Sequence, residues 1–254
     1  MKKRSHWKVI LNDRDRLILR DLFYSKGLNL ELLMANHFKG LDKSTVVKRM
    51  NRLSKEKFLD KRVHLEQGKS KVIYHITEKG LDEIASLLSG KVIRRELKSS
   101  NPDHDLEVAR IFYSLLRARG LNDLKFENEI QCISFGDFDG EYEPFRRLNT
   151  DIYLSLQIKD KSYKVAIEYE RSQKESGRWT EYLLNYHMED QVDLVLYICK
   201  GLTIKNSMIR IESELAKSYQ AKIYFCSLEE FFGNDSTAIF QNGNGKSFKL
   251  NFHD

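Results

Sequence analysis

Apolar residues recur at helical spacing near the start of the chain, and this pattern predicts a helix over residues 13–25. Ile18, Leu22 and Phe23 fall on one side of that helix, and Gly27 follows it as a C-terminal cap. We therefore expect the helix to bury this side against neighbouring elements.

Two more helices are predicted directly behind the first. Asn29 can cap a short second helix that ends by Gly40, and Asp42 or Ser44 can cap a third helix. The third helix carries an apolar stripe made of Val46, Val47, Met50 and Leu53. Its other faces carry Lys43, Thr45, Lys48, Arg49 and Arg52.

Apolar alternation then predicts two strands over residues 58–66 and 71–77, joined by a loop of Gln67, Gly68, Lys69 and Ser70. A fourth helix is expected over residues 77–88, followed by a polar, basic linker. We place a domain boundary within residues 96–102, which gives domains of residues 1–98 and 99–254.

The charge of the chain is divided unevenly between these two parts. Residues 1–98 carry 24 Lys/Arg against 12 Asp/Glu, whereas the remainder carries 19 against 25. A basic front end favours an anionic partner, although runs of charge are often only a solvated helix face. The residues expected to contact DNA are Lys43, Ser44, Thr45, Lys48, Arg49, Arg52, Lys69 and Lys71.

The order helix, helix, basic helix and basic hairpin resembles the winged helix-turn-helix superfamily. That resemblance implies a third helix lying in the major groove of double-stranded DNA and a wing touching the adjacent backbone. Because the charge excess coincides with this order of elements, we favour duplex DNA binding over a merely solvated surface.

The second part of the chain reads as an α/β domain. A long helix from His104 precedes strand-like runs at residues 125–135, 150–158 and 163–170, with turns between them. Further elements are expected as a helix at 173–188, a strand at 193–200, a helix at 204–219 and a last strand at 221–227. The fold class is therefore α/β (α+β overall), with a mixed central sheet.

Three acidic residues stand where they could converge on one edge of this sheet. Asp151 opens the second strand, and Glu168 and Glu170 lie two apart near the end of the third, so they share a face. Carboxylate oxygens are ligands that Mg²⁺ prefers, and such a metal can activate water for phosphodiester hydrolysis. The alternative is that these acids are solvated or paired with nearby arginines.

Asp151 and Glu168 match a pattern of the restriction-endonuclease-like superfamily, which the second domain resembles. The resemblance implies a catalytic group of Asp151, Glu168, Glu170 and Lys174, in which Asp151 and Glu168 hold Mg²⁺ and Glu170 orients the attacking water. Glu170 stands where the superfamily usually has lysine, and Lys174 can supply the missing cation. The same departure is equally compatible with a loss of nuclease activity.

The winged helix, then HDLEVARIF, then the strand pair and helix up to TEYLLNY together resemble the replication-relaxation family of plasmids and integrative elements, over roughly residues 10 to 200. The resemblance implies DNA binding linked to replication or mobilisation. Two functions remain open: a metal-dependent DNA endonuclease of a mobile element, or an inactive DNA-binding regulator or accessory factor. Replication, mobilisation or transposition proteins are candidate partners, and a homodimer would match two-fold DNA sites.

The remaining residues yield more modest expectations. Cys132, Cys199 and Cys226 are widely spaced in apolar runs, which favours buried thiols over a metal knuckle or disulfides. No run of about 18 apolar residues occurs, so we expect a cytoplasmic protein without membrane contact. Tyr182 and Tyr186 are expected to pack against the sheet.

Overall fold

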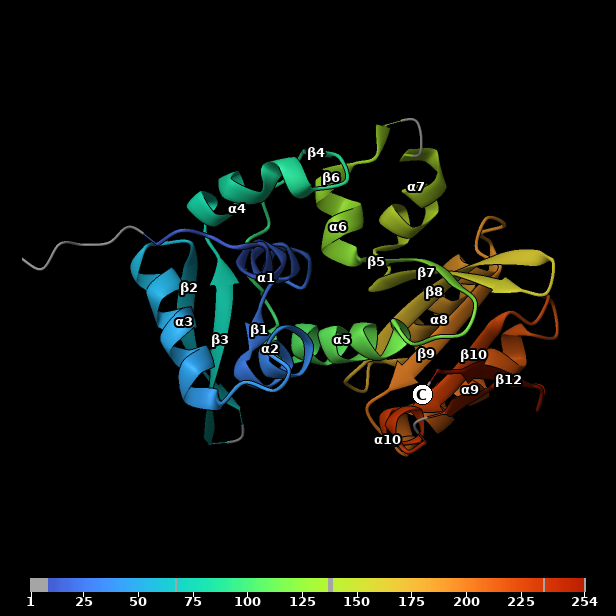
Figure 1. Cartoon of the computed structure of the whole chain (residues 1–254). Helices are drawn as coiled ribbons and strands as arrows, with labels where there is room; N and C mark the ends of the chain where they lie inside the picture. The colour runs from blue at the N-terminus through green and yellow to red at the C-terminus, as the bar shows by residue number, and fades with distance from the viewer. Residues whose placement is uncertain (1–8, 67, 137–138, 235, 254) are drawn as a thin grey trace, which may run out of the picture. The chain divides into compact units, whose positions relative to one another are not determined.

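In the computed structural model the chain forms two compact units, and each is described by itself (Figure 1). Unit 1 comprises residues 1–109 and 132–135, and unit 2 comprises residues 110–131 and 136–254. The structure describes residues 9–66, 68–136, 139–234 and 236–253. Helix α5 (Pro102–Leu115) contributes residues to both units.

Unit 1 begins with the order of elements that a winged helix-turn-helix requires. These elements are α1 (Asp13–Tyr24), β1 (Leu28–Asn29), α2 (Leu30–His37), α3 (Lys43–Lys55), β2 (Leu59–Glu66) and β3 (Lys69–Ile76). Strand β3 lies in the middle of a three-stranded sheet, antiparallel to both β1 and β2. Figure 1 shows the β2–β3 hairpin beside α3.

Local hydrogen bonds explain where these helices start. Asn12 and Asp15 form a capping box at α1, in which each side chain accepts a backbone N–H of the other residue at 2.9 Å. Asn29 accepts the N–H of Leu32 at α2, and Asp42 accepts the N–H of Thr45 at α3. The predictions of an Asn29 cap and of Asp42 as the cap of the third helix are thus confirmed.

The helices of unit 1 bury their apolar sides against the sheet. In α3, Val46, Met50 and Leu53 are fully buried, whereas Val47 is half-buried. The last registered pair of the hairpin is Glu66 with Lys69, and Gln67 of the predicted loop lies outside the described residues. Unit 1 continues through α4 (Glu78–Ile84), η1 (Ala85–Leu87) and β4 (Lys91–Val92), which pairs with β6 (Ile133–Ser134).

Unit 2 is built on a seven-stranded sheet in the order β12-β11-β10-β9-β8-β7-β5. Strands β8, β9 and β10 run parallel, and the other neighbours are antiparallel. The mixed α/β class with a mixed central sheet is therefore confirmed. The strands are β5 (Leu121–Phe126), β7 (Ile152–Ile158), β8 (Lys161–Glu170), β9 (Leu194–Cys199), β10 (Ile223–Ser227), β11 (Thr237–Gln241) and β12 (Ser247–Asn251).

Two crossover helices connect the parallel strands of unit 2. Helix α8 (Ser176–His187) joins β8 to β9, and α9 (Leu202–Leu215) joins β9 to β10. The buried ring of Phe126 on β5 stacks on Phe112 of α5, with ring centroids 3.6 Å apart. Because Phe126 pairs with Ile152 and Ile152 with Ile167, Phe112 in the part of α5 that belongs to unit 2 lies on the sheet face opposite to that of Glu168.

The predicted strand over residues 125–135 is wrong for most of its length. Strand β5 ends at Phe126, and α6 (Glu127–Cys132) takes its place. Asn128, Glu129 and Gln131 are buried, so polar positions that looked solvent-facing are inside. Gln131, for example, donates its side-chain amide to the carbonyl of Arg146 at 2.6 Å.

Other elements of unit 2 were not predicted. Residues read as turns form α7 (Asp139–Leu148), a helix that contains Pro144. Strand β10 is not the last strand, because α10 (Leu228–Phe232) and the β11–β12 hairpin follow it. The GKS sequence at residues 245–247 lies at the turn of this hairpin, so it has no strand-then-helix context of a phosphate loop.

All three cysteines are free and buried, which confirms the expectation of buried thiols. Burial raises the pKa of Cys132 to about 11 and that of Cys199 to about 12, so both thiols stay protonated at neutral pH. Within the described ranges, no helix has both the length and the apolar character needed to cross a membrane.

Candidate functional site

Helix α3 presents a polar stripe on the side opposite its buried residues. The exposed members of this polar stripe are Ser44, Thr45, Lys48, Asn51, Arg52 and Lys55, and Lys43 is exposed beside them in the first turn. These positions recur every three or four residues, so they form one continuous surface along the helix. The structure therefore separates the apolar and polar faces of α3 as the sequence pattern predicted.

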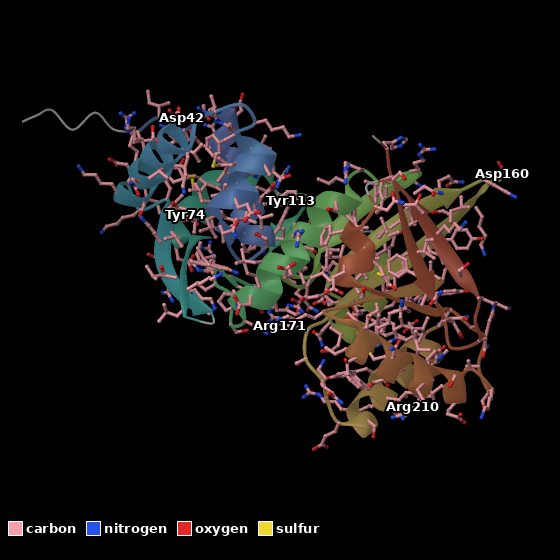
Figure 2. All side chains as sticks on the ribbon, turned by 90° about the horizontal axis from the view of Figure 1, so that it is seen from below. Asp42, Tyr74, Tyr113, Asp160, Arg171 and Arg210 are labelled. Atoms are coloured by element: carbon pink, nitrogen blue, oxygen red, sulfur yellow. The ribbon has the colours of Figure 1, made fainter. Side chains whose placement is uncertain are left out.

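Asp42, labelled in Figure 2, organises the N-terminal end of this stripe. Its carboxylate accepts the hydroxyls of Ser44 and Thr45, each at 2.6 Å, as well as the Thr45 N–H at 3.0 Å. The hydroxyl of Ser44, the largest contribution, and that of Thr45 lower the pKa of Asp42 well below its usual range. Ser44 and Thr45 thus have their donors committed to a helix cap.

Arg49, one of the residues expected to contact DNA, is half-buried and is held by Asp15 of α1. Its Nε donates to Oδ1 of Asp15 at 2.9 Å, and a second guanidinium nitrogen forms an ion pair with Oδ2. A further bond of 3.1 Å reaches the carbonyl of Ile10. Because the Asp15 side chain is completely buried, Arg49 fastens α3 to α1.

The other cations of α3 are available to solvent. In the part of unit 1 that the structure describes, Lys43, Lys48, Arg52 and Lys55 form no ion pair, and α3 contains no acidic residue. Lys48 and Arg52 lie four residues apart, an arrangement of like charges that destabilises an isolated helix. Arg52 and Lys55 lie in the last turn, where the helix dipole favours cations, whereas Lys43 lies in the first turn, where it does not, so helix stability explains only part of this concentration of charge.

The two lysines predicted on the wing differ in their surroundings. Lys69 is exposed at the tip of the hairpin. Lys71 is half-buried and pairs across the hairpin with His64, whose Nε2 lies 3.3 Å from Oδ2 of Asp103 on α5. The two lysines lie two residues apart on β3 and share one face of the hairpin, but Lys69 is exposed at the tip and Lys71 is half-buried further along the strand.

In unit 2 the acidic residues do come together, at the edge where β7 begins and β8 ends. Ile152 pairs with Ile167, so Asp151 comes opposite Glu168 across the two antiparallel strands. Oδ2 of Asp151 accepts the backbone N–H of Tyr169 at 2.8 Å. We call Asp151, Glu168 and Glu170 the carboxylate cluster.

Helix α8 supplies a donor that holds Glu168. The hydroxyl of Tyr186 donates to Oε1 of Glu168 and lies 2.7 Å from the hydroxyl of Thr150. Burial and the neighbouring Glu168 raise the pKa of Tyr186 well above its ordinary value, so this phenol stays protonated and keeps donating. Tyr186 packs against the sheet as expected, and it does so as a buried hydrogen-bond donor.

Glu170 is buried and is held by three donors. Lys174 Nζ lies 2.5 Å from its Oε2, the indole Nε1 of Trp179 donates to the same oxygen at 3.1 Å, and the Ser172 N–H donates to Oε1 at 3.3 Å. Lys174, which was expected to replace a catalytic lysine, thus forms an ion pair with the acid at the usual lysine position. Trp179 is itself buried beneath the sheet.

Protein donors are distributed unevenly over the carboxylate cluster. Both oxygens of Glu170 accept hydrogen bonds, whereas the bonds described above reach Oδ2 of Asp151 and Oε1 of Glu168. Across the residues that the structure describes, no group of three or more His, Cys, Asp or Glu side chains is placed to hold a metal ion.

Two residues important to these sites were not predicted from the sequence: Asp15, which fixes Arg49, and Trp179, which binds Glu170. For Tyr186, which donates to Glu168, only the packing against the sheet was predicted. One sequence signal was available, because Trp179 and Tyr186 lie seven residues apart and therefore share one face of α8. Nothing local to Asp15 indicated a partner 34 residues away.

The family model described as replication-relaxation matches residues 19–188. This match covers about two thirds of the chain and spans both α3 and the carboxylate cluster. The chain belongs to the replication-relaxation family. The predicted resemblance is confirmed, and membership of the replication-relaxation family agrees with a role in plasmid replication or mobilisation. Neither a curated protein nor a solved structure matches the chain.

Proposed function

We propose that this replication-relaxation protein binds double-stranded DNA through the polar stripe of α3 and the tip of the β2–β3 hairpin. It would act as an accessory factor in the replication or mobilisation of a plasmid or other mobile element. The observation that carries the proposal is the set of exposed cations on α3, which have no acidic partner within the described part of unit 1.

The physical argument is electrostatic. A helix that concentrates cations on one exposed side is suited to neutralise DNA phosphates and release their counterions. The proposed phosphate contacts are Lys43, Lys48, Arg52, Lys55 and Lys69, and Arg49 is a positioning residue that orients α3.

Salt dependence of duplex affinity tests this proposal. We expect the affinity to fall steeply as salt rises, and the slope of log K against log salt to lose about 0.9 in Lys48→Ala and in Arg52→Ala. Fluorescence anisotropy with a labelled duplex measures both. Arg210→Ala is the matched control, because it removes an exposed cation of α9 in unit 2 (Figure 2). Equal slopes in all four proteins would refute the assignment of α3.

A metal-dependent endonuclease is the competing function. The observation that favours it is the contact between Lys174 and Glu170, because this contact brings a cation to the position where nuclease-like domains usually have lysine. Because both oxygens of Glu170 accept protein donors and no group of three or more potential metal ligands is found among the described residues, we expect no cleavage of supercoiled plasmid with Mg²⁺, Mn²⁺ or EDTA. Nicking that requires metal and disappears in both Asp151→Ala and Glu168→Ala would establish the nuclease instead.

A further inference from the structure

Asn51 occupies a distinctive place on the polar stripe of α3. It is exposed, and it lies three residues after Lys48 and four before Lys55, so cations flank it on the same side of the helix. Among the described residues no side-chain hydrogen bond of Asn51 is found. Its amide therefore keeps both a donor and an acceptor directed to solvent.

We infer that Asn51 is a specificity-determining residue that reads an adenine in the major groove. The inference rests on the proposed function, because it requires α3 to lie in that groove. The amide of asparagine matches adenine through two bonds, donating to N7 and accepting from the N6 amino group. No other base presents this donor and acceptor pair in the same positions.

The neighbouring residues are less able to supply this selectivity. Lys48, Arg52 and Lys55 are attracted to every phosphate, whatever the base, and they pair with guanine when they reach a base edge. The hydroxyl protons of Ser44 and Thr45 go to Asp42. Asn51 is thus an uncharged residue of the polar stripe whose amide keeps its donor and its acceptor available. Its arrangement of donor and acceptor matches adenine and no other base.

Selection from a randomised duplex library tests the inference, using wild type, Asn51→Ala and the control Asn185→Ala. Asn185 is an exposed asparagine on α8 of unit 2, so the control repeats the chemical change away from α3. Because alanine is the better helix former, the Asn51→Ala chain is expected to fold, and thermal melting verifies this.

The wild type is expected to enrich a motif that contains an adenine, and Asn51→Ala is expected to weaken that adenine preference about tenfold. Asn185→Ala should give the wild-type motif. An unchanged adenine preference in Asn51→Ala, with duplex binding retained, overturns the role of Asn51 and leaves the proposed function intact. Duplex binding by the wild type with steep salt dependence but no enriched motif also overturns the role of Asn51 and leaves the proposed function intact. Absence of duplex binding by the wild type overturns the proposed function as well.

Discussion

Arg49→Ala is expected to destabilise unit 1 by about 3–5 kcal/mol, because it leaves the carboxylate of Asp15 buried without its cation. Asp15 is completely buried, and Arg49 bonds it through two guanidinium nitrogens. The hydrogen bond that Arg49 donates to Asp15 is also the main cause that raises the pKa of Arg49 above its ordinary value. Urea unfolding followed by circular dichroism measures the loss.

Arg52→Ala is the matched control for this prediction. Arg52 lies three residues further along α3, is exposed and forms no ion pair within the described residues, so its removal should change stability by no more than about 0.5 kcal/mol. We expect the two variants to separate folding from binding: Arg49→Ala loses stability, and Arg52→Ala loses duplex affinity. Wild-type stability in Arg49→Ala would contradict its positioning role.

Glu212→Ala is expected to destabilise unit 2 to a similar extent, by about 3–5 kcal/mol. Nε2 of His187 on α8 lies 2.9 Å from Oε2 of Glu212 on α9, and both side chains are fully buried. The imidazole also stacks on Tyr219, with ring centroids 5.1 Å apart. Removing the glutamate therefore leaves a buried imidazole without its partner.

Two further variants sharpen this second prediction. Glu214→Ala removes an exposed acid of the same helix, paired with Lys217, and should cost less than about 1 kcal/mol. The double replacement His187→Leu with Glu212→Leu removes both buried polar groups and is expected to cost less than Glu212→Ala alone. If Glu212→Ala proved as mild as Glu214→Ala, the buried pair would not hold α8 to α9.

Much of unit 1 could be predicted because its signals are local. The caps of α2 and α3 lie within three residues of the N–H groups that they accept, so Asn29 and Asp42 could be recognised in the sequence. The role of Arg49 could not be predicted. Its positive charge is equally suited to a DNA phosphate and to a carboxylate, and its partner Asp15 lies 34 residues earlier in the chain. A buried ion pair and a free phosphate contact look alike in a sequence.

The limits in unit 2 have the same physical origin. Strand alternation placed Asp151 and Glu168 at one sheet edge, but it gave no information about the donors from α8 that hold Glu168 and Glu170. The residues of helix α6 were predicted as a strand because polar residues such as Asn128 and Gln131 were taken to face solvent. In the structure both side chains are buried. Polar patterning predicts exposure correctly only where the polar group has no partner inside the protein.

The most direct test of the central claim is photo-crosslinking of the full chain to a duplex with a photoreactive phosphate backbone, followed by mass spectrometry of the attached peptides. The account predicts crosslinks in residues 43–55 of α3 and around Lys69 at the tip of the hairpin, and their suppression by competitor duplex. Crosslinks confined to residues 110–254, with none in α3 or the hairpin, would contradict it.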